Sequence, residues 1–325
     1  MLNKSLIAAA ALACTLGASA QTSINLANYQ VSANYTLAAL GGLGLEASAV
    51  TYARDRGTLF FVGDEGLGVV EISPTGQTLG SMAFNWAGTG SSNNDAEGLT
   101  YLGGGQLAVV DERPQIAYRF GYTAGGTVTL ANQPRASVGS TTGNVGNVGT
   151  EGISFDPRDG SFVSVKQDGP VELRAGALTF STSGGTSGMT TLFSGATSLF
   201  GVNSFSDVQT LSPVDALAGS TAADNLLILS LDSRRLIEVT RSGQILSFLD
   251  LTGVTNQAIE GLTVDELGTI YLVAEDSGTS NSRLFVLSAT GVVGAVPEPE
   301  TYALMLGGLG LVAWIARRRK ARATA

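Results

Sequence analysis

The segment 97–131, EGLTYLGGGQLAVVDERPQIAYRFGYTAGGTVTLA, carries the pattern that decides the fold. Glycine- or proline-containing turns separate four runs of strand length, at Glu97–Leu102, Gln106–Glu112, Ala117–Tyr122 and Thr127–Ala131. Four antiparallel strands within about 50 residues are typical of one blade of a β-propeller. The segment therefore predicts a blade, and a propeller needs several of them.

The first run of this segment recurs along the chain. The matching phrases are SAVTY at Ser48–Tyr52, EGLTY at Glu97–Tyr101, EGISF at Glu151–Phe155, SDVQ at Ser206–Gln209 and EGLTV at Glu260–Val264. They begin 49, 54, 55 and 54 residues apart, and a second apolar run follows each of them. The repeat predicts an all-β propeller of five blades, each a four-stranded antiparallel sheet.

Two details of this architecture stay open. The last repeat lacks an outer strand, and residues 29–40 are expected to supply it by closing the ring. A sixth, degenerate blade is an alternative for residues 178–205, and a repeated β-sandwich is the rival architecture, although no Cys or Trp signature supports it.

Composition excludes much familiar chemistry. The chain has 43 glycines and 44 % hydrophobic residues, which suits short strands joined by tight turns. It has no histidine, and its one cysteine is Cys14. These absences exclude a Ser-His-Asp triad and a His-bound zinc, and they leave carboxylates as the metal ligands, which favour a hard ion such as calcium.

The N-terminal residues 1–20 are predicted to be a signal peptide. Lys4 precedes an apolar run at 6–16, and Ala18-Ser19-Ala20 has the small-residue pattern of a cleavage site. The run is short for the alternative, a permanent anchor, because a membrane span needs about 20 residues.

The C-terminal residues 296–325 are predicted to be a second targeting segment. Pro297, Glu298 and Pro299 precede an apolar stretch at 301–316, predicted to be a transmembrane helix, and a basic end at 317–320. This order resembles the PEP-CTERM sorting signal, which implies cleavage by an exosortase-type protease, a transient membrane anchor, and release or attachment at the cell surface. An ordinary tail anchor is the alternative.

The propeller domain between the two ends, residues 21–295, is strongly acidic. Residues 21–296 contain 12 Lys and Arg against 25 Asp and Glu, a net charge of −13. Such a body is a poor partner for nucleic acid and a better one for cations.

The repeated phrases also resemble a known family. The segments 46–73, 95–120, 146–170, 226–251 and 258–276 are similar to the SdiA-regulated family of exported β-propellers, and the resemblance spans about residues 28–290. It implies the propeller fold, a similarity to phytase-like propellers and a link to calcium, but no reaction.

The repeat predicts where carboxylates gather, because the first strand of each blade lines the central channel. Two acidic sets are candidate calcium ligands. The set on the first strands is Glu97, Glu151, Asp207 and Glu260. The set after the second apolar runs is Asp64-Glu65, Asp111-Glu112, Asp232 and Glu275-Asp276, of which Glu65, Glu112, Asp232 and Glu275 are the candidate ligands. The second set is expected at the opposite end of the channel or beside the next turn. The alternative role for the repeated glutamates is to latch one blade to the next by accepting hydrogen bonds.

Three function hypotheses follow, and the sequence does not decide whether the protein is an enzyme. The leading one is an exported, surface-attached or secreted, calcium-binding propeller with an interaction or envelope role. The second is a calcium-dependent hydrolase of phosphomonoesters or lactones, with Glu112, Arg113 and Lys166 as candidate catalytic residues. The third is a structural component of an extracellular polysaccharide matrix.

Overall fold

The computed structural model describes residues 22–64, 67–91, 93–141, 143–195, 200–277 and 279–290. The predicted signal peptide, the sorting tail with Pro297, Glu298 and Pro299, and the candidate ligand Glu65 lie outside these residues. None of the helices in the described part of the chain combines the length and the apolar character needed to span a bilayer.

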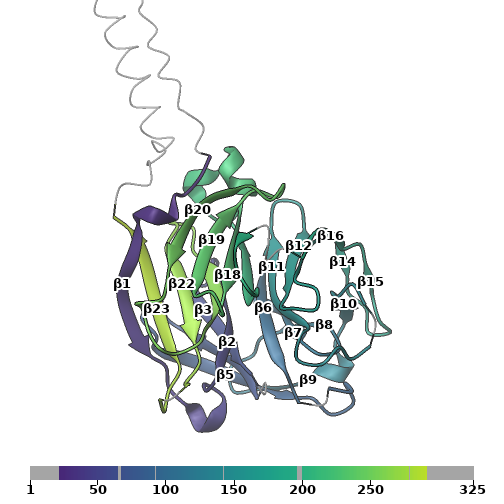
Figure 1. The fold of residues 1–325 in the computed structure, drawn as a ribbon. Helices are drawn as coiled ribbons and strands as arrows, with labels where there is room; N and C mark the ends of the chain where they lie inside the picture. Colours follow the sequence, from purple (N-terminus) through teal and green to yellow (C-terminus); the bar gives the residue numbers. More distant parts are fainter. Residues whose placement is uncertain are drawn as a thin grey trace, which may run out of the picture.

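Five antiparallel sheets form the blades of a β-propeller (Figure 1). Blade 1 contains β2 (Ala47–Ala53), β3 (Thr58–Gly63), β4 (Gly68–Ile72) and β5 (Thr78–Asn85). Blade 2 contains β6 (Ala96–Gly103), β7 (Gln106–Asp111), β8 (Ile116–Gly121) and β10 (Arg135–Ser137). Blade 3 contains β11 (Thr150–Asp156), β12 (Ser161–Lys166), β13 (Glu172–Gly176) and β16 (Thr190–Ser194). The prediction of five four-stranded blades is confirmed by these sheets and the next two.

Blade 4 contains β17 (Asp207–Thr210), β18 (Leu226–Ser230), β19 (Arg235–Val239) and β20 (Ile245–Asp250). Blade 5 contains β21 (Ile259–Val264), β22 (Ile270–Ala274), β23 (Arg283–Ala289) and, as its outer strand, β1 (Tyr29–Thr36). The N-terminal strand lies against β23 in antiparallel register, with Tyr29 opposite Ala289. The expected ring closure by the segment after residue 29 is confirmed, and β1 covers the edge that β23 would otherwise expose.

The sequence analysis was wrong about two local details. The segment 178–205 forms no sixth blade in its described part, because β14 (Leu178–Thr179) and β15 (Thr186–Ser187) make a short hairpin and β16 completes blade 3. The strand expected at Thr127–Ala131 does not complete blade 2. Its first part, β9 (Thr127–Thr129), pairs in parallel with β5 of blade 1, and β10 takes the outer place of blade 2.

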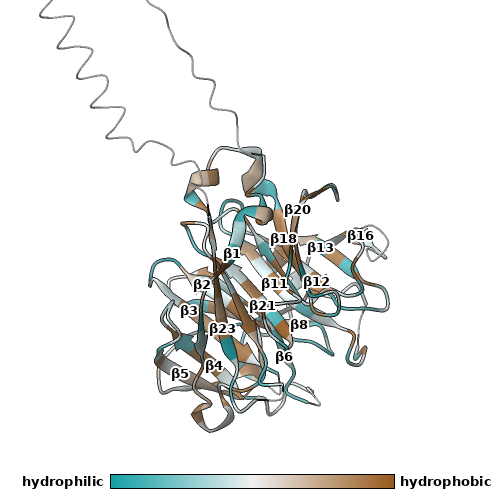
Figure 2. Ribbon diagram, turned by 60° about the vertical axis from the view of Figure 1, so that its left-hand side comes forward, coloured by the Kyte–Doolittle hydropathy of each residue, from teal (hydrophilic) through white to brown (hydrophobic). Residues whose placement is uncertain are grey.

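The core lies between the blades. Five clusters of buried apolar side chains each join two neighbouring blades, so both faces of the inner strands are covered. Every residue of β18 and β22 is buried, and Figure 2 shows hydrophobic residues along β18 and β23. Burial of apolar surface on both faces explains why these strands read as continuous apolar runs.

Candidate cation site at one mouth of the channel

The first strands β2, β6, β11, β17 and β21 contact one another in a closed circle and surround the central channel. Antiparallel pairing sets the start of each first strand beside the end of the second strand, with Ala96 opposite Asp111 and Ile259 opposite Ala274. Both predicted acidic sets therefore belong to one end of the channel, which we call the acidic mouth. The expectation of opposite ends was wrong, because a hairpin returns its second strand to the level where the first began.

Three carboxylates from two blades converge at the acidic mouth. One carboxylate oxygen from each of Asp64, Asp95 and Glu97 lies within 4.8 Å of the other two. Asp64 follows β3 of blade 1, whereas Asp95 and Glu97 stand at the start of blade 2, two residues apart. Asp95 precedes β6 and Glu97 lies at the register shift between Ala96 and Gly98, and both carboxylates reach Asp64.

Glu112 extends this group from the end of β7. Its side chain is 1 % exposed, and its Oε1 accepts a hydrogen bond from the Gly149 amide at 2.7 Å. Its Oε2 is buried and has no hydrogen-bond partner among the described residues. Glu112 also belongs to the carboxylates that raise the pKa of Asp95 and of Glu97. A buried carboxylate oxygen without a donor is costly, and a cation would compensate it.

The glutamates of the repeat phrase face the same group. Burial raises the pKa of Glu97 well above its usual range, and the negative charges of Glu260, Asp64 and Asp95 raise it further. Burial and the charges of Glu97, Glu112 and Glu260 do the same to Glu151. These shifts express like charges held close together in a low-dielectric environment.

Asp207 has a different role in the structure. Its Oδ1 accepts from the Val208 amide at 2.7 Å, and its Oδ2 accepts from the Leu262 amide of blade 5 at 2.7 Å. Burial raises its pKa well above the usual range, while these two N–H groups lower it. Asp207 thus forms the kind of blade-to-blade latch considered for the repeated carboxylates.

The two remaining described candidates, Glu275 and Asp232, differ in their contacts and exposure. Glu275 lies close to Glu260: burial is the largest cause of the raised pKa of Glu260, and the charge of Glu275 is the next. Glu275 also accepts a hydrogen bond from Ser277. Asp232 lies exposed in the turn between β18 and β19. Each described candidate thus has a place. Asp64 belonged to the second acidic set but was not chosen as a ligand, and Asp95 was not considered. The signal for Asp95 was its position two residues before Glu97.

The candidate catalytic cations already have partners. The Arg113 Nε donates to Asp95 Oδ2 at 2.5 Å, and its Nη2 donates to Asn147 Oδ1 at 2.6 Å. The Lys166 ammonium, 5 % exposed as a residue, donates to the backbone carbonyl of Asp168. Burial lowers its pKa, and the nearby charge of Glu172 opposes that effect.

Two other positions of the phrase hold the blades together around the channel. At the second position, a Cβ added to Gly261 would lie 2.8 Å from Ala49 Cα, and one added to Gly152 would lie 2.4 Å from Asp207 Oδ1. Glycine is therefore required there by the close approach of the next blade.

The fourth position supplies a ring of hydroxyl latches that the sequence analysis missed. Its bonds run from Tyr101 N to Thr51 Oγ1 (3.0 Å), Phe155 N to Thr100 Oγ1 (2.9 Å), Thr210 N to Ser154 Oγ (3.1 Å), Thr263 Oγ1 to Gln209 Oε1 (3.0 Å) and Tyr52 N to Thr263 Oγ1 (3.1 Å). These five bonds together join every pair of neighbouring blades. The recurring Thr, Thr, Ser, Gln and Thr at this position were the available signal.

The chain is similar to two solved structures at low identity. The β-propeller domain of Myceliophteria thermophila Cps50 (Swd1) is 12 % identical with a TM-score of 0.37, and the match covers 75 % of this chain and 66 % of that one. A chain of the nidogen/laminin complex is 11 % identical with a TM-score of 0.41, and the match covers 76 % of this chain and 86 % of that one.

Family models match two parts of the chain. The model of the PEP-CTERM protein-sorting motif matches residues 295–320, which indicates export, processing by an exosortase-type protease and membrane-associated sorting toward the cell surface. The SdiA-regulated model matches residues 21–278, nearly the whole propeller. The chain therefore belongs to the SdiA-regulated family.

Proposed function

We propose that this exported propeller binds calcium at its acidic mouth and serves an interaction or envelope role at the cell surface. The observation that carries the proposal is the buried, unpartnered Glu112 Oε2 beside the group formed by Asp64, Asp95 and Glu97. An acidic cluster alone is common, whereas a buried carboxylate oxygen without a donor among the described residues needs compensation, and a cation among the neighbouring carboxylates Asp95 and Glu151 would supply it.

The donor set fits calcium rather than a softer metal. All four side chains offer carboxylate oxygens, and the chain has no histidine. Calcium takes six to eight oxygen ligands at about 2.3–2.6 Å, so two oxygens on opposite sides of the ion stand about 4.6–5.2 Å apart. The 4.8 Å limit within the three-carboxylate group is compatible with that span. Asp64, Asp95, Glu97 and Glu112 would hold the ion, and Glu151 and Glu260 would add negative potential.

A binding role is better supported than hydrolysis. A calcium-dependent phosphomonoesterase or lactonase needs a basic group that can clamp the reacting oxygens. Arg113 is engaged by Asp95 and Asn147, and Lys166 is engaged by the Asp168 carbonyl.

The proposal is tested with the full chain in detergent, by calorimetric titration with calcium and with magnesium after treatment with a chelator. We expect calcium-selective binding that raises the midpoint of thermal unfolding, because the ion binds only the folded state. Glu97→Gln should lower calcium affinity by about tenfold or more. The matched control is Asp232→Asn, which changes an exposed acidic residue outside the group and should leave affinity unchanged.

Two results would contradict the proposal. One is the absence of calcium binding at millimolar ion, and the other is equal affinity in the Glu97→Gln chain. Turnover of a phosphomonoester or lactone that disappears with chelator would instead support the hydrolase hypothesis.

A further inference from the structure

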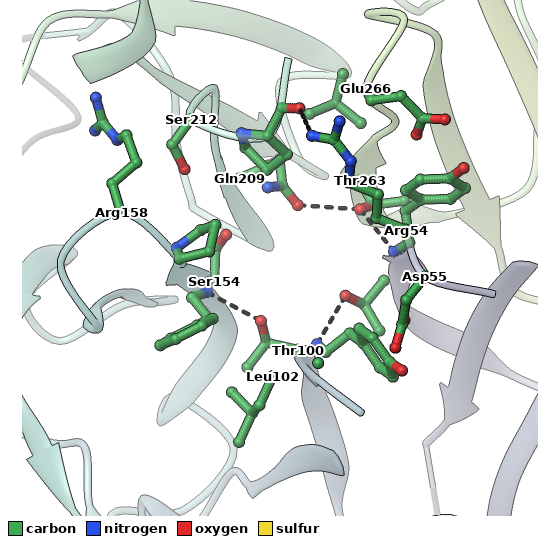
Figure 3. A pocket seen from close by; sticks show the side chains of 18 residues that line it. Arg54, Asp55, Thr100, Leu102, Ser154, Arg158, Gln209, Ser212, Thr263 and Glu266 are labelled. Carbon is green, nitrogen blue, oxygen red and sulfur yellow. Dashed lines mark hydrogen bonds between the residues drawn. The ribbon is translucent and has the colours of Figure 1, made fainter. Parts of the chain in front are cut away.

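The opposite end of the channel opens into a pocket of about 640 Å³ (Figure 3). All five first strands and the turns after them contribute to its lining. The volume lies within the roughly 300–1,000 Å³ typical of small-molecule sites. We call this end the pocket mouth, and it shares no lining residue with the carboxylate group of the acidic mouth.

The floor of the pocket offers hydrogen-bond donors. Thr51 and Thr100 line it, are 6 % and 4 % exposed, and use their oxygens to accept the latch bonds from the next blade. Their hydroxyl protons reach no acceptor in the described part of the chain. A hydroxyl can donate and accept at once, so both protons remain for a ligand.

The rim offers an acceptor. Glu266 follows β21 and lines the pocket, and its Oε2 is buried without a hydrogen-bond partner among residues that the structure describes. The Glu266 carboxylate thus lies at the rim of the same pocket, and a ligand hydroxyl that reaches it would supply the donor that Oε2 lacks among the described residues.

The wall carries aromatic rings. The fifth position of the phrase places Tyr52, Tyr101 and Phe155 on three consecutive blades, each half-buried and each lining the pocket. Tyr101 stacks on Phe60 with ring centroids 5.9 Å apart, and Tyr52 stacks on Tyr271 at 6.5 Å. Stacking against the core keeps these rings in place, and aromatic faces bind apolar C–H surface.

The two arginines of the lining are paired within the protein. Arg54 Nη2 lies 2.8 Å from Asp215 Oδ2, and Arg158 pairs with Asp156 at 2.7 Å and Asp224 at 2.8 Å. A phosphorylated or otherwise anionic ligand would have to break these ion pairs. The lining also contains the carboxylates Asp55 and Glu266, which repel an anion, so an uncharged ligand is favoured over an anionic one.

We propose that the pocket mouth binds the ring of a neutral sugar, either free or at the end of a glycan chain. A sugar ring combines a C–H face, which fits the aromatic wall, with hydroxyls that donate to Glu266 and accept from Thr51 and Thr100. The proposal does not rest on calcium binding at the other mouth.

The test uses the full chain in a detergent without a sugar head group. Saturation-transfer NMR and calorimetry are run with glucose, galactose, mannose, N-acetylglucosamine and their disaccharides, with glucose 6-phosphate and choline as charged probes. We expect at least one neutral sugar to bind and the charged probes to bind more weakly.

Variants locate the binding. Tyr101→Ala should lower sugar affinity about tenfold, which corresponds to about 1.4 kcal/mol, and Glu266→Gln should lower it severalfold. If Tyr101→Ala unfolds, Tyr101→Phe keeps the ring and should retain binding, and Glu266→Gln remains as the loss variant. Phe248→Ala removes an aromatic ring that is 53 % exposed on β20, outside the pocket, and serves as the matched control.

Three results would overturn the proposal. They are no binding of any neutral sugar in the panel, tighter binding of glucose 6-phosphate or choline, and unchanged affinity in Glu266→Gln or in a folded Tyr101→Ala chain.

Discussion

The two mouths of the channel are built from the same five strands, yet their charged side chains are arranged differently. At the acidic mouth, burial and nearby carboxylates raise the pKa of Glu97, Glu151 and Glu260, and Glu112 Oε2 is buried without a donor among the described residues. At the pocket mouth, Arg54 and Arg158 are paired with carboxylates. A repeated phrase therefore makes two rings of different chemistry, because its first positions and its fourth and fifth positions emerge at opposite ends.

The mouths also differ in their relation to the chain termini. Tyr29 begins β1 opposite Ala289 near the end of β23, and its hydroxyl donates to the Gly268 carbonyl in the turn after β21. β1 thus begins and β23 ends on the side of the pocket mouth, and the acidic mouth lies at the other end of the channel (Figure 1).

If close backbone contact seals the acidic mouth, Gly261→Ala should be the most damaging single change. The new Cβ would lie 2.8 Å from Ala49 Cα and 2.5 Å from Val273 Cγ2, so a backbone must move. We expect a loss of about 3 kcal/mol in the free energy of unfolding, measured by denaturant titration. Gly253→Ala is the control, since nothing lies within 4 Å of its added Cβ. Equal stability of the two variants would show that the blades are not sealed by this contact.

The latch formed by Asp207 should be the next most sensitive feature. In Asp207→Asn, the amide nitrogen faces one of the two N–H groups that the carboxylate now accepts, from Val208 and Leu262. One buried N–H loses its acceptor, which costs about 2 kcal/mol. Chemical denaturation of this variant and of the exposed Asp232→Asn control measures the difference. A neutral effect at both positions would contradict the latch.

The pKa shifts at the acidic mouth predict an unusual pH dependence without calcium. Folding raises the pKa of Glu97, Glu151 and Glu260, so above the ordinary carboxylate range the folded chain binds more protons than the unfolded one. Stability should therefore fall as pH rises, by about 1.4 kcal/mol per pH unit for each extra proton.

Denaturant titrations in chelator between about pH 5 and pH 8 measure this slope. Calcium should flatten it, because the ion replaces the protons and needs ionised ligands. Stability in chelator that increases with pH over this window would contradict the repulsion inferred for the acidic mouth.

The smallest change is expected for one hydroxyl latch at the pocket mouth. Thr100→Val keeps the shape of the side chain but leaves the Phe155 amide without its 2.9 Å acceptor, at a cost of about 1 kcal/mol. Thr127→Val on the exposed β9 is the control, with a change within about 0.5 kcal/mol. Thermal unfolding of both chains compares them, and a Thr100→Val midpoint equal to the control would argue against a stabilising latch.

The sequence predicted more of the fold than of the candidate site. The period of the EG phrase and the apolar second strands were sufficient for five blades, because each blade is a local unit whose strands follow one another along the chain. The same reasoning misplaced Thr127–Ala131, since the pairing of β9 with β5 joins segments from two blades. It also placed the second acidic set at the wrong end of the channel, although antiparallel pairing brings the end of the second strand back beside the start of the first.

By itself, the sequence determined the propeller, its blade number and the residue types that line its channel, because strand periodicity and repeat spacing are local properties. Only the tertiary structure decided that Asp64 of one blade meets Asp95 and Glu97 of the next, and that Asp207 is a latch. Contacts of this kind depend on the register of neighbouring blades once the ring has closed. That register follows from packing across the whole molecule rather than from any single segment.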